Sequence, residues 1–323
     1  VVIEKKHLKK ALNALHESFF IEEIKKVNLF IIGLGNVGKA FLEQVSNQQV
    51  YLLDKLNMNL VIIGAANSKT MIFDEQGLSP TTFMEELSQS EVFNQANFLE
   101  QMRNLNLRNS IFIDITASAT VAEIYEEVLK ESISVVTPNK IAATREYKHY
   151  SLLKSLSKKY KSQFLFETNV GAGLPVLSTL SDLVKSGDQI IKIEAVLSGT
   201  LNFIFNNYNA HTPFVEVVKL AKKEGYTEPD PRLDLSGEDV MRKILILARE
   251  SGYQFDLDEV MGNSFLPESC QTSRNEADFY LKLASNETHF SKLYQEAESK
   301  ECKLRYVASF QDEKLTTGLS QIG

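Results

Sequence analysis

Among the charged side chains of one short stretch, GYTEPDPRLDLSGEDVMRK (residues 225–243), five are candidates for chemistry. They are Glu228, Asp230, Asp234, Asp239 and Lys243. An apolar run, residues 240–248, follows at once and is predicted to form a core helix. A polar cluster that leads into a core helix can present chemistry on a rigid element. On these residues alone, a helix cap with a surface ion pair worth about 0.5 kcal/mol explains the pattern equally well.

The predicted helix is expected to start at a polar cap. Ser236 fits an N-cap, and Asp239 fits the acidic partner of a capping box three residues later. Asp239 and Lys243 are four residues apart, so they are neighbours on one side of the helix. Glu228 precedes the helix, in a stretch that Pro229 and Pro231 hold extended.

The composition is typical of a soluble globular protein with two domains, since 43% of its 323 residues are hydrophobic and 24% are charged. The net charge of −7 argues against a nucleic-acid surface. The sequence has no secretory leader and no apolar run of the ~20 residues that a membrane helix needs. Cys270 and Cys302 suggest neither a disulfide framework nor a metal site. We therefore expect a cytoplasmic protein without nucleic-acid or membrane partners.

A glycine-rich turn follows the first apolar run, residues 27–33. Gly33, Gly35 and Gly38 have the G-x-G-x-x-G spacing, and an apolar helix comes after them. In a dinucleotide-binding fold the first glycine permits the tight turn, the second lets a pyrophosphate approach the backbone, and the third allows close helix packing. This order of strand, turn and helix favours dinucleotide binding over a structural glycine turn.

The second strand is predicted at residues 59–65. The residues that follow it are Ala66, Asn67, Ser68 and Lys69. No carboxylate ends this strand to hold a ribose 2′-hydroxyl, and Asp54, which has the usual spacing, belongs to a predicted helix end. A hydroxyl and a lysine suit a 2′-phosphate, so the sequence favours NADP, with NAD as the alternative. Residues 70–109 are expected to form helices and loops without chemistry.

Two more predicted strands, residues 111–115 and 133–137, each end in a polar turn. The turns contain Thr116, Ala117, Ser118, Pro138, Asn139 and Lys140. Ligands of open α/β sheets bind at the carboxyl ends of strands, so both turns are expected at the edge that carries the glycine turn. A helix dipole disfavours a cation at the position of Lys140, which indicates an anionic or carbonyl ligand. A surface lysine at a helix start is the alternative.

A second glycine-rich segment, ETNVGAGLP, spans residues 167–175. Gly171 and Gly173 bend the chain so that carbonyl oxygens can converge near Glu167. One carboxylate with several carbonyls suits a hard monovalent or divalent cation. By spacing alone, a glycine turn capped by Pro175 at a helix start is the simpler interpretation.

These motifs together resemble the homoserine dehydrogenase family, and in particular the dehydrogenase half of bifunctional aspartokinase–homoserine dehydrogenases. The matching blocks run in family order: GLGNVGKAFLEQ (33–44), GAANSK (64–69), TPNK (137–140), ETNVGAGLP (167–175), LSGTLNFIF (197–205), GYTEPDPRLDLSGEDVMRKILILARE (225–250) and LRYVASF (304–310). The resemblance implies an α/β fold, with a Rossmann doubly wound parallel sheet and a second α+β domain for substrate binding and dimerisation. It also implies NAD(P)H-dependent, reversible reduction of L-aspartate 4-semialdehyde to L-homoserine, in threonine, methionine and isoleucine biosynthesis.

The resemblance also assigns roles to residues. It makes Lys243 the general acid, with Asp239 to orient it. Glu228 and Asp239 would bind the substrate amino group, with Lys140 beside the substrate and the nicotinamide. The implied cofactor contacts are Gly33, Gly35, Asn36, Val37, Gly38, Ala66, Ser68, Lys69, Thr116, Ala117, Ser118, Lys140 and Gly225. The implied cation, read as Na⁺, is held by Glu167 and by the carbonyls of Val170, Ala172 and Leu174.

The expected domains are the tail of a preceding regulatory, ACT-like region (1–26), an NAD(P)-binding Rossmann domain (27–165), a substrate-binding, catalytic and dimerisation domain (166–310) and the start of a C-terminal return to the Rossmann domain (311–323). Residues 1–26 are predicted to be a helix with Leu8, Leu12, Leu15 and Phe19 on one face. A homodimer or larger homo-oligomer is the assembly that the resemblance implies.

Two alternatives to this enzyme stay open. Family members continue beyond the position of Gly323, so the chain is expected to be truncated, and a catalytically incomplete cofactor-binding fragment is the first alternative. The second is aspartate-semialdehyde dehydrogenase, which needs a nucleophilic cysteine near a strand end. Cys270 and Cys302 lie in polar, helix-rich stretches and do not fit that role.

Overall fold

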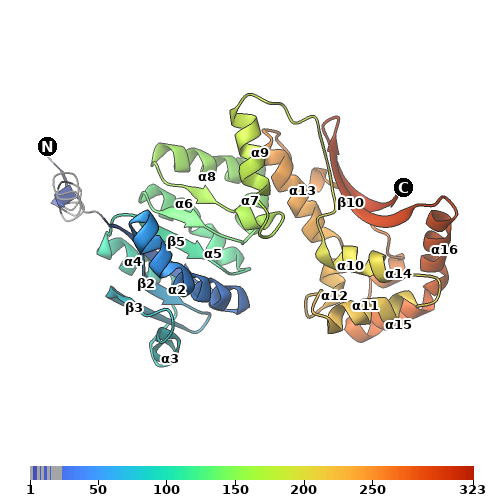
Figure 1. Cartoon of the computed structure of the whole chain (residues 1–323), viewed down its shortest axis with the longest axis horizontal. Helices are drawn as coiled ribbons and strands as arrows, with labels where there is room; N and C mark the ends of the chain where they lie inside the picture. Colours follow the sequence, from blue (N-terminus) through green and yellow to red (C-terminus); the bar gives the residue numbers. More distant parts are fainter. Residues whose placement is uncertain (1–2, 6–7, 9–10, 13–14, 16–23) are drawn as a thin grey trace. The chain divides into compact units, whose positions relative to one another are not determined.

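The computed structural model describes residues 3–5, 8, 11, 12, 15 and 24–323. The chain divides into two compact units, shown in Figure 1. Unit 1 comprises the chain up to Ala143 together with Lys148–Asn169, and unit 2 comprises Thr144–Tyr147 and Val170–Gly323. The helix predicted for residues 1–26 lies largely outside the described residues. No helix in the described ranges is both long and apolar enough to cross a bilayer.

Unit 1 is built on a seven-stranded sheet with the order β4-β3-β2-β1-β5-β6-β7. The strands are β1 Lys25–Ile32, β2 Met58–Ala66, β3 Thr70–Leu78, β4 Glu91–Val92, β5 Ser110–Asp114, β6 Ser134–Val136 and β7 Phe164–Leu165. β1, β2, β5, β6 and β7 run parallel, as the predicted Rossmann sheet requires. β3 and β4 are antiparallel strands at one edge, so the expectation of only helices and loops in residues 70–109 was wrong.

Asn67 explains the unexpected strand β3. Its side-chain oxygen accepts hydrogen bonds from the backbone N–H groups of Lys69 and Thr70, at 2.7 and 2.8 Å. This local bonding reverses the chain within a few residues. The next segment therefore pairs back against β2 instead of crossing to the other side of the sheet.

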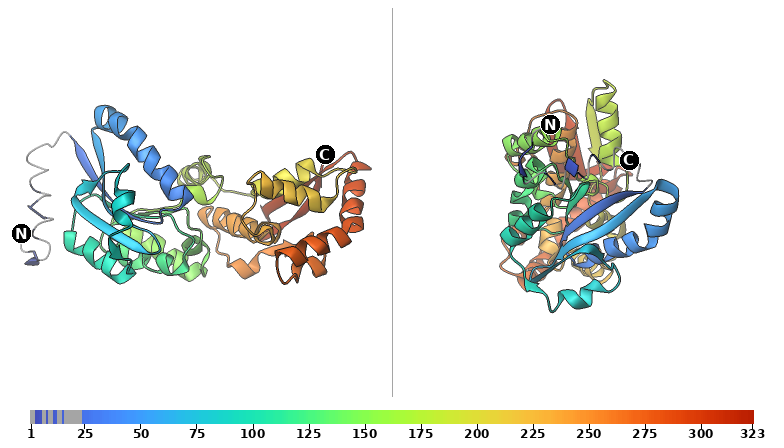
Figure 2. Two further views of the ribbon diagram at one scale, coloured as in Figure 1. Left: turned by 90° about the horizontal axis from the view of Figure 1, so that it is seen from below. Right: turned by 90° about the vertical axis from the view of Figure 1, so that its left-hand side faces the viewer.

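Helices cover both faces of the first sheet. They are α2 Asn36–Leu56, α3 Phe83–Leu87, α4 Gln95–Leu105, α5 Ala119–Glu123, α6 Tyr125–Lys130, α7 Ile141–Thr144 and α8 Tyr147–Lys159. α2 lies on one face, and α4, α6 and α8 lie on the other (Figures 1 and 2). A row of aromatic rings fills the second face, with neighbouring centroids 4.8–6.5 Å apart: Phe30, Phe73, Phe98, Phe112, Tyr125 and Phe164.

Unit 2 contains a four-stranded sheet with the order β8-β10-β11-β9. The strands are β8 Lys192–Ala195, β9 Met261–Asn263, β10 Lys303–Gln311 and β11 Lys314–Ile322. β10 contains the block LRYVASF (304–310) that matches the family. β11 pairs antiparallel with β10 along its whole length. β11 lies in the segment 311–323, which was expected to begin a return to the first domain, and it instead adds a strand to the second sheet. Asp312 and Glu313 form the turn, and both have positive φ, as a tight hairpin requires.

Three helices of unit 2 contact β10, and the others pack mainly against neighbouring helices. The helices of this unit are α9 Val176–Lys185, α10 Gly199–Asn207, α11 Phe214–Lys223, α12 Pro231–Leu235, α13 Glu238–Glu250, α14 Glu268–Gln271, α15 Glu276–Ser285 and α16 Glu287–Glu298. Alternate side chains of β10, Leu304, Tyr306 and Phe310, are buried. α10, α13 and α16 all contact this strand, which places the helix of the predicted catalytic pair on the core sheet.

The polar stretch 225–243 forms two helices, and the predicted capping box at Ser236 was wrong. Ser236 ends α12 and donates its hydroxyl to the Leu233 carbonyl at 2.7 Å. Gly237, with φ of +78°, is the N-cap of α13 and lies against β10. A Cβ atom at Gly237 would lie 2.2 Å from the Tyr306 hydroxyl oxygen. Close packing and a left-handed backbone therefore require glycine where the new helix starts.

Candidate active site

The glycine turn between β1 and α2 leaves an open approach to a helix N-terminus. A Cβ atom at Gly33 would lie 2.3 Å from the Ile115 carbonyl oxygen, and one at Gly38 would lie 2.2 Å from the Gly33 carbonyl oxygen. A Cβ at Gly35 would meet nothing within 4 Å. Gly35 is the N-cap of α2, whose first turn has no acidic residue and no side-chain cap. Packing thus requires the outer two glycines, while the middle one leaves room for a phosphate at the helix start.

Asn36 and Val37 are exposed at the same helix end, as the predicted cofactor contact requires. The turn after β2 lies beside them, because the Gly33 N–H donates to the Ala66 carbonyl at 2.9 Å. Ser68 and Lys69 are exposed at the tip of that turn. The structure therefore brings the glycine turn and the predicted 2′-phosphate residues to one edge of the sheet.

The polar turns after β5 and β6 lie at the same edge, since β1, β5 and β6 are parallel neighbours. Ser118 accepts a hydrogen bond from the Val121 N–H and caps α5, and Thr116 and Ala117 precede it. Lys140 is half-buried and directly precedes α7. Lys140 lies in unit 1, whereas Glu228, Asp239 and Lys243 lie in unit 2.

Lys243 and Asp239 form the predicted pair on α13. The Lys243 Nζ atom lies 2.7 Å from Asp239 Oδ2 and also donates to the Leu197 carbonyl oxygen at 2.7 Å. The Lys243 side chain is 17% exposed and that of Asp239 is 47% exposed. The ammonium group is thus held by two acceptors in a sheltered position, while the Asp239 side chain is nearly half-exposed.

Glu228 is connected to the same region through two residues that the sequence analysis did not assign. Asp234 Oδ2 accepts a hydrogen bond from the Glu228 N–H at 2.9 Å, and Asp234 Oδ1 accepts one from the Thr200 hydroxyl at 3.0 Å. Thr200 lies in the first turn of α10, three residues after Leu197. Lys243 and Glu228 are therefore both anchored at the start of α10. The polar turn Ser198-Gly199-Thr200 was the available sequence signal.

Gly225 begins the loop that carries Glu228. It follows α11 with φ of +77°, and a Cβ there would meet nothing within 4 Å. The next residue, Tyr226, stacks on Phe203 of α10 with ring centroids 4.2 Å apart. Asp230, by contrast, has a structural role, because it caps α12 and pairs with Arg232, whose hydrogen bonds lower the pKa of Asp230. Stacking and capping hold the loop at both ends.

The residues of the predicted cation site are divided between the units. Glu167 opens the 3-10 turn η2 Glu167–Asn169, while Val170, Ala172 and Leu174 belong to unit 2. Ala172 has positive φ, and the Leu174 carbonyl accepts a hydrogen bond from the Val176 N–H at 2.9 Å. Within the described chain, no cluster of three or more Asp, Glu, His or Cys side chains suits a metal ion. A cation here would therefore depend on backbone carbonyls, and the site stays a prediction.

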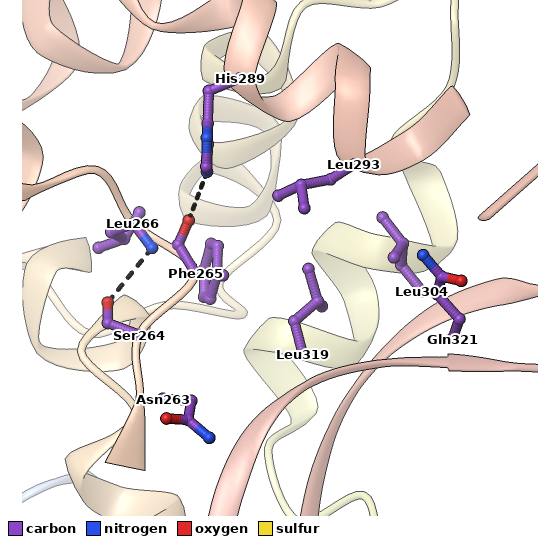
Figure 3. A pocket seen from close by; sticks show the side chains of 9 residues that line it. All are labelled: Asn263, Ser264, Phe265, Leu266, His289, Leu293, Leu304, Leu319 and Gln321. Atoms are coloured by element: carbon purple, nitrogen blue, oxygen red, sulfur yellow. Dashed lines mark hydrogen bonds between the residues drawn. The ribbon is translucent and has the colours of Figure 1, made fainter. Parts of the chain in front are cut away.

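A cavity of about 280 Å³ in unit 2, shown in Figure 3, contains none of the predicted site residues. Its lining is Asn263, Ser264, Phe265, Leu266, His289, Leu293, Leu304, Leu319 and Gln321. Two of its polar groups bond within the protein: His289 Nε2 lies 2.9 Å from the Phe265 carbonyl oxygen, and Ser264 accepts from the Leu266 N–H. None of the predicted roles therefore depends on this cavity.

Neither cysteine is placed as a nucleophile. Cys270 is 1% exposed, and burial raises the pKa of its thiol, which disfavours the reactive thiolate. Cys302 donates its thiol to the Lys300 carbonyl in the turn before β10. The chemistry of aspartate-semialdehyde dehydrogenase therefore finds no support.

The parallel sheet with its open glycine turn has the arrangement of a dinucleotide-binding domain. The family model for homoserine dehydrogenase matches residues 175–322, and the model for the homoserine dehydrogenase NAD-binding domain matches residues 33–167. The chain belongs to the homoserine dehydrogenase family. The predicted family and the predicted fold are thus confirmed.

Curated relatives are longer than this chain. The bifunctional aspartokinase/homoserine dehydrogenase 1 of Zea mays is 38% identical over 309 residues, which are 95% of this chain and 34% of that protein. The bifunctional enzyme of Haemophilus influenzae is 38% identical over 305 residues, which are 94% of this chain and 37% of that protein. The chain therefore spans about a third of the length of these relatives.

Solved structures share the fold. A Candida auris protein of unknown function is 29% identical with a TM-score of 0.81, over 92% of this chain and 84% of that one. A hyperthermophilic archaeal homoserine dehydrogenase in complex with NADPH is 24% identical with a TM-score of 0.68, over 92% of this chain and 82% of that one. Because the archaeal enzyme is only 24% identical to this chain, the comparison with it supports a shared fold and nothing further.

Proposed function

We propose that this chain catalyses the reversible, NAD(P)H-dependent reduction of L-aspartate 4-semialdehyde to L-homoserine. The observation that carries the proposal is the position of Lys243 Nζ, 2.7 Å from both Asp239 Oδ2 and the Leu197 carbonyl oxygen. A sheltered ammonium group with fixed acceptors on a core helix is preorganised to transfer a proton. Family membership supplies the substrate class.

In this proposal Lys243 moves the proton. The nicotinamide cofactor supplies a hydride to the aldehyde carbon when it is bound. Lys243 donates a proton from Nζ to the carbonyl oxygen, so the aldehyde becomes a primary alcohol. In the reverse direction Lys243 accepts the hydroxyl proton. Asp239 and Leu197 hold Nζ in place throughout, which limits the reorganisation that the step requires.

Carboxylates on the same elements suit the α-ammonium group of the substrate. Glu228 is exposed, and its backbone is fixed by Asp234. The Asp239 carboxylate is nearly half-exposed although it contacts Lys243. An amino-acid aldehyde carries its ammonium group at one end and its carbonyl at the other. We infer that Glu228 and Asp239 bind the first group while Lys243 meets the second.

We infer that NADP is the preferred cofactor. Gly35 leaves an open helix N-terminus for the pyrophosphate, and Ser68 and Lys69 are exposed at the neighbouring turn. A lysine and a hydroxyl can bind a 2′-phosphate, whereas a carboxylate would repel it. Thr116, Ala117, Ser118 and Lys140 complete the inferred cofactor edge, with Gly225 as a further contact from unit 2.

Several broader assignments belong to the same proposal. We propose a monovalent cation, expected to be Na⁺, at Glu167 and the carbonyls of Val170, Ala172 and Leu174. Ala172 and the glycine before it both have positive φ, which bends the backbone there. We also propose a homodimeric assembly in the cytoplasm and a parent protein that carries aspartate kinase activity. The bifunctional relatives, whose printed names include aspartokinase, support the last point.

The test is NADPH oxidation that depends on L-aspartate 4-semialdehyde. Removal of a general acid typically lowers the rate about 10²- to 10⁴-fold, so Lys243→Ala is expected to lower kcat within that range. Lys219→Ala is the matched control, because Lys219 is an exposed lysine that pairs with Glu216 on α11. Equal turnover by Lys243→Ala and the control would overturn the assignment of the general acid.

A further inference from the structure

A carboxylate with no role in the proposed chemistry is fully buried at the end of β5. Asp114 is 0% exposed, and neutral groups donate to it: the Thr116 N–H at 2.8 Å, the Tyr125 hydroxyl at 2.5 Å and the Asn139 side-chain amide at 3.1 Å. A carboxylate buried without a basic partner is costly, so stability alone does not account for it. Its position next to the cofactor edge suggests another use.

Asn139 connects this carboxylate to both polar turns of the edge. Its side-chain nitrogen donates to Asp114 and also to the Ser118 carbonyl at 3.0 Å. Its side-chain oxygen accepts from the Ile141 N–H at 3.1 Å, which fixes the backbone on the far side of Lys140. Asp114 in turn holds Thr116. One carboxylate thus links the turn after β5 to the turn after β6.

Thr137 closes the network at the end of β6. Its hydroxyl donates to the Asp114 carbonyl at 2.9 Å and accepts from the Asn139 N–H at 2.9 Å. Every member of this network is buried: Asp114, Tyr125, Thr137 and Asn139 are each at most 4% exposed. A fully bonded, buried network holds its backbone segments in one arrangement.

Tyr125 joins the network to the core of unit 1. Its ring belongs to the aromatic row, 6.3 Å from Phe112 and 5.8 Å from Phe164. Burial, and then the adjacent Asp114 carboxylate, raise the pKa of Tyr125, so the phenol keeps its proton and donates it in a hydrogen bond. The network is therefore anchored to a rigid core and not to a surface loop.

We propose that Asp114 is a positioning residue for the nicotinamide cofactor, which it serves by fixing the distance between the Thr116–Ser118 turn and the Thr137–Lys140 turn. Asn139, Thr137 and Tyr125 transmit this constraint. The inference rests on the proposed function, because it assumes that these turns contact the cofactor. It goes further in assigning a role to four buried residues that the proposed function leaves without one.

The experiment compares two variants of the network with a control. Tyr125→Phe keeps the ring and removes only the hydroxyl, and Asn139→Ala removes the link between the turns. Loss of one positioning hydrogen bond is expected to raise the KM and the dissociation constant for NADPH about five- to tenfold in Tyr125→Phe, and more in Asn139→Ala. Changes in kcat are expected to be smaller than the changes in KM.

Phe98→Leu is the control for lost stability. Phe98 is fully buried in the same aromatic row, and its side chain has no polar group that could hydrogen-bond to either turn. It is expected to lower the thermal midpoint while NADPH binding stays unchanged. The proposal is overturned if both network variants bind NADPH as tightly as wild type does. It is also overturned if Phe98→Leu weakens NADPH binding as much as a network variant that loses the same amount of thermal midpoint. Wild-type protein that fails to bind NADPH would instead overturn the proposed function.

Discussion

The hydroxyl oxygen of Thr200 lies 3.0 Å from Asp234 Oδ1 and also bonds to the Tyr226 carbonyl, and these contacts tie the loop of Glu228 to the start of α10. The other oxygen of the same carboxylate accepts from the Glu228 N–H at 2.9 Å. Both oxygens of Asp234 are therefore used as acceptors. Asparagine at this position would keep one acceptor oxygen for either the Glu228 N–H or the Thr200 hydroxyl. Its NH2 group would then face the other of these two groups.

Asp234→Asn is accordingly expected to impair substrate binding. The loop would lose one anchor, so the KM for L-aspartate 4-semialdehyde should rise about tenfold, with a smaller effect on kcat. Steady-state kinetics at saturating NADPH measure this. Leu233→Ala is the matched control, since Leu233 is the adjacent residue and is 63% exposed. An Asp234→Asn enzyme with the KM of wild type would show that the anchor is dispensable.

The proposed preference for NADPH predicts an effect of substituting Lys69. Lys69→Ala removes the cation at the end of β2, so the KM for NADPH should rise about tenfold while the KM for NADH stays within about twofold. Lys55→Ala, an exposed lysine in the last turn of α2, serves as the control. A parallel loss with both cofactors would contradict a role in binding the 2′-phosphate.

The buried carboxylate predicts a pH effect on stability. Burial raises the pKa of Asp114 above its ordinary value of 3.8, so the folded state favours the protonated form more than the unfolded state does. Relative to Asp114→Asn, the unfolding free energy of wild type should therefore fall as the pH rises from below 3.8 through the raised pKa, and then level off. Urea unfolding of both proteins across this pH range measures the difference. If the unfolding free energy of wild type instead rose relative to that of Asp114→Asn as the pH rises, the direction of the pKa shift would be contradicted.

Gly237 should tolerate no side chain. Gly237→Ala places a Cβ 2.2 Å from the Tyr306 hydroxyl and forces alanine into positive φ, so a loss of about 2–4 kcal/mol in unfolding free energy is expected. Tyr306→Phe in the same chain should recover part of this loss, because it removes the clashing oxygen. Strictly additive effects of the two substitutions would show that the contact does not determine the cost.

The sequence predicted the parts of the fold that depend on local pattern. Buried strands such as β1 and β5, the glycine turn and the Asp239–Lys243 ion pair on α13 all follow from apolar runs and short-range spacing. Asp239 and Lys243 lie four residues apart on one helix, so their contact requires no knowledge of the fold.

Long-range packing was harder to predict. The start of α13 depends on Gly237 lying against Tyr306, a residue far away in the sequence, and so the cap at Ser236 was misassigned. The strand β3 depends on a reversal at Asn67 that resembles any polar turn. Asp114 acts through partners from other elements, so its sequence neighbours carry no sign of a role. Asp234 and Thr200 lie in polar stretches that the sequence does mark, but their contact with each other depends on the fold.

The most direct test of the account is deuterium transfer from NADPH that is deuterated at the nicotinamide C4 position. Wild-type chain incubated with L-aspartate 4-semialdehyde should yield homoserine with one deuterium on the alcohol carbon, detected by mass spectrometry. Lys243→Ala should yield almost none in the same time. Binding of NADPH by wild type without any labelled homoserine would contradict the account and leave the chain as a cofactor-binding fragment.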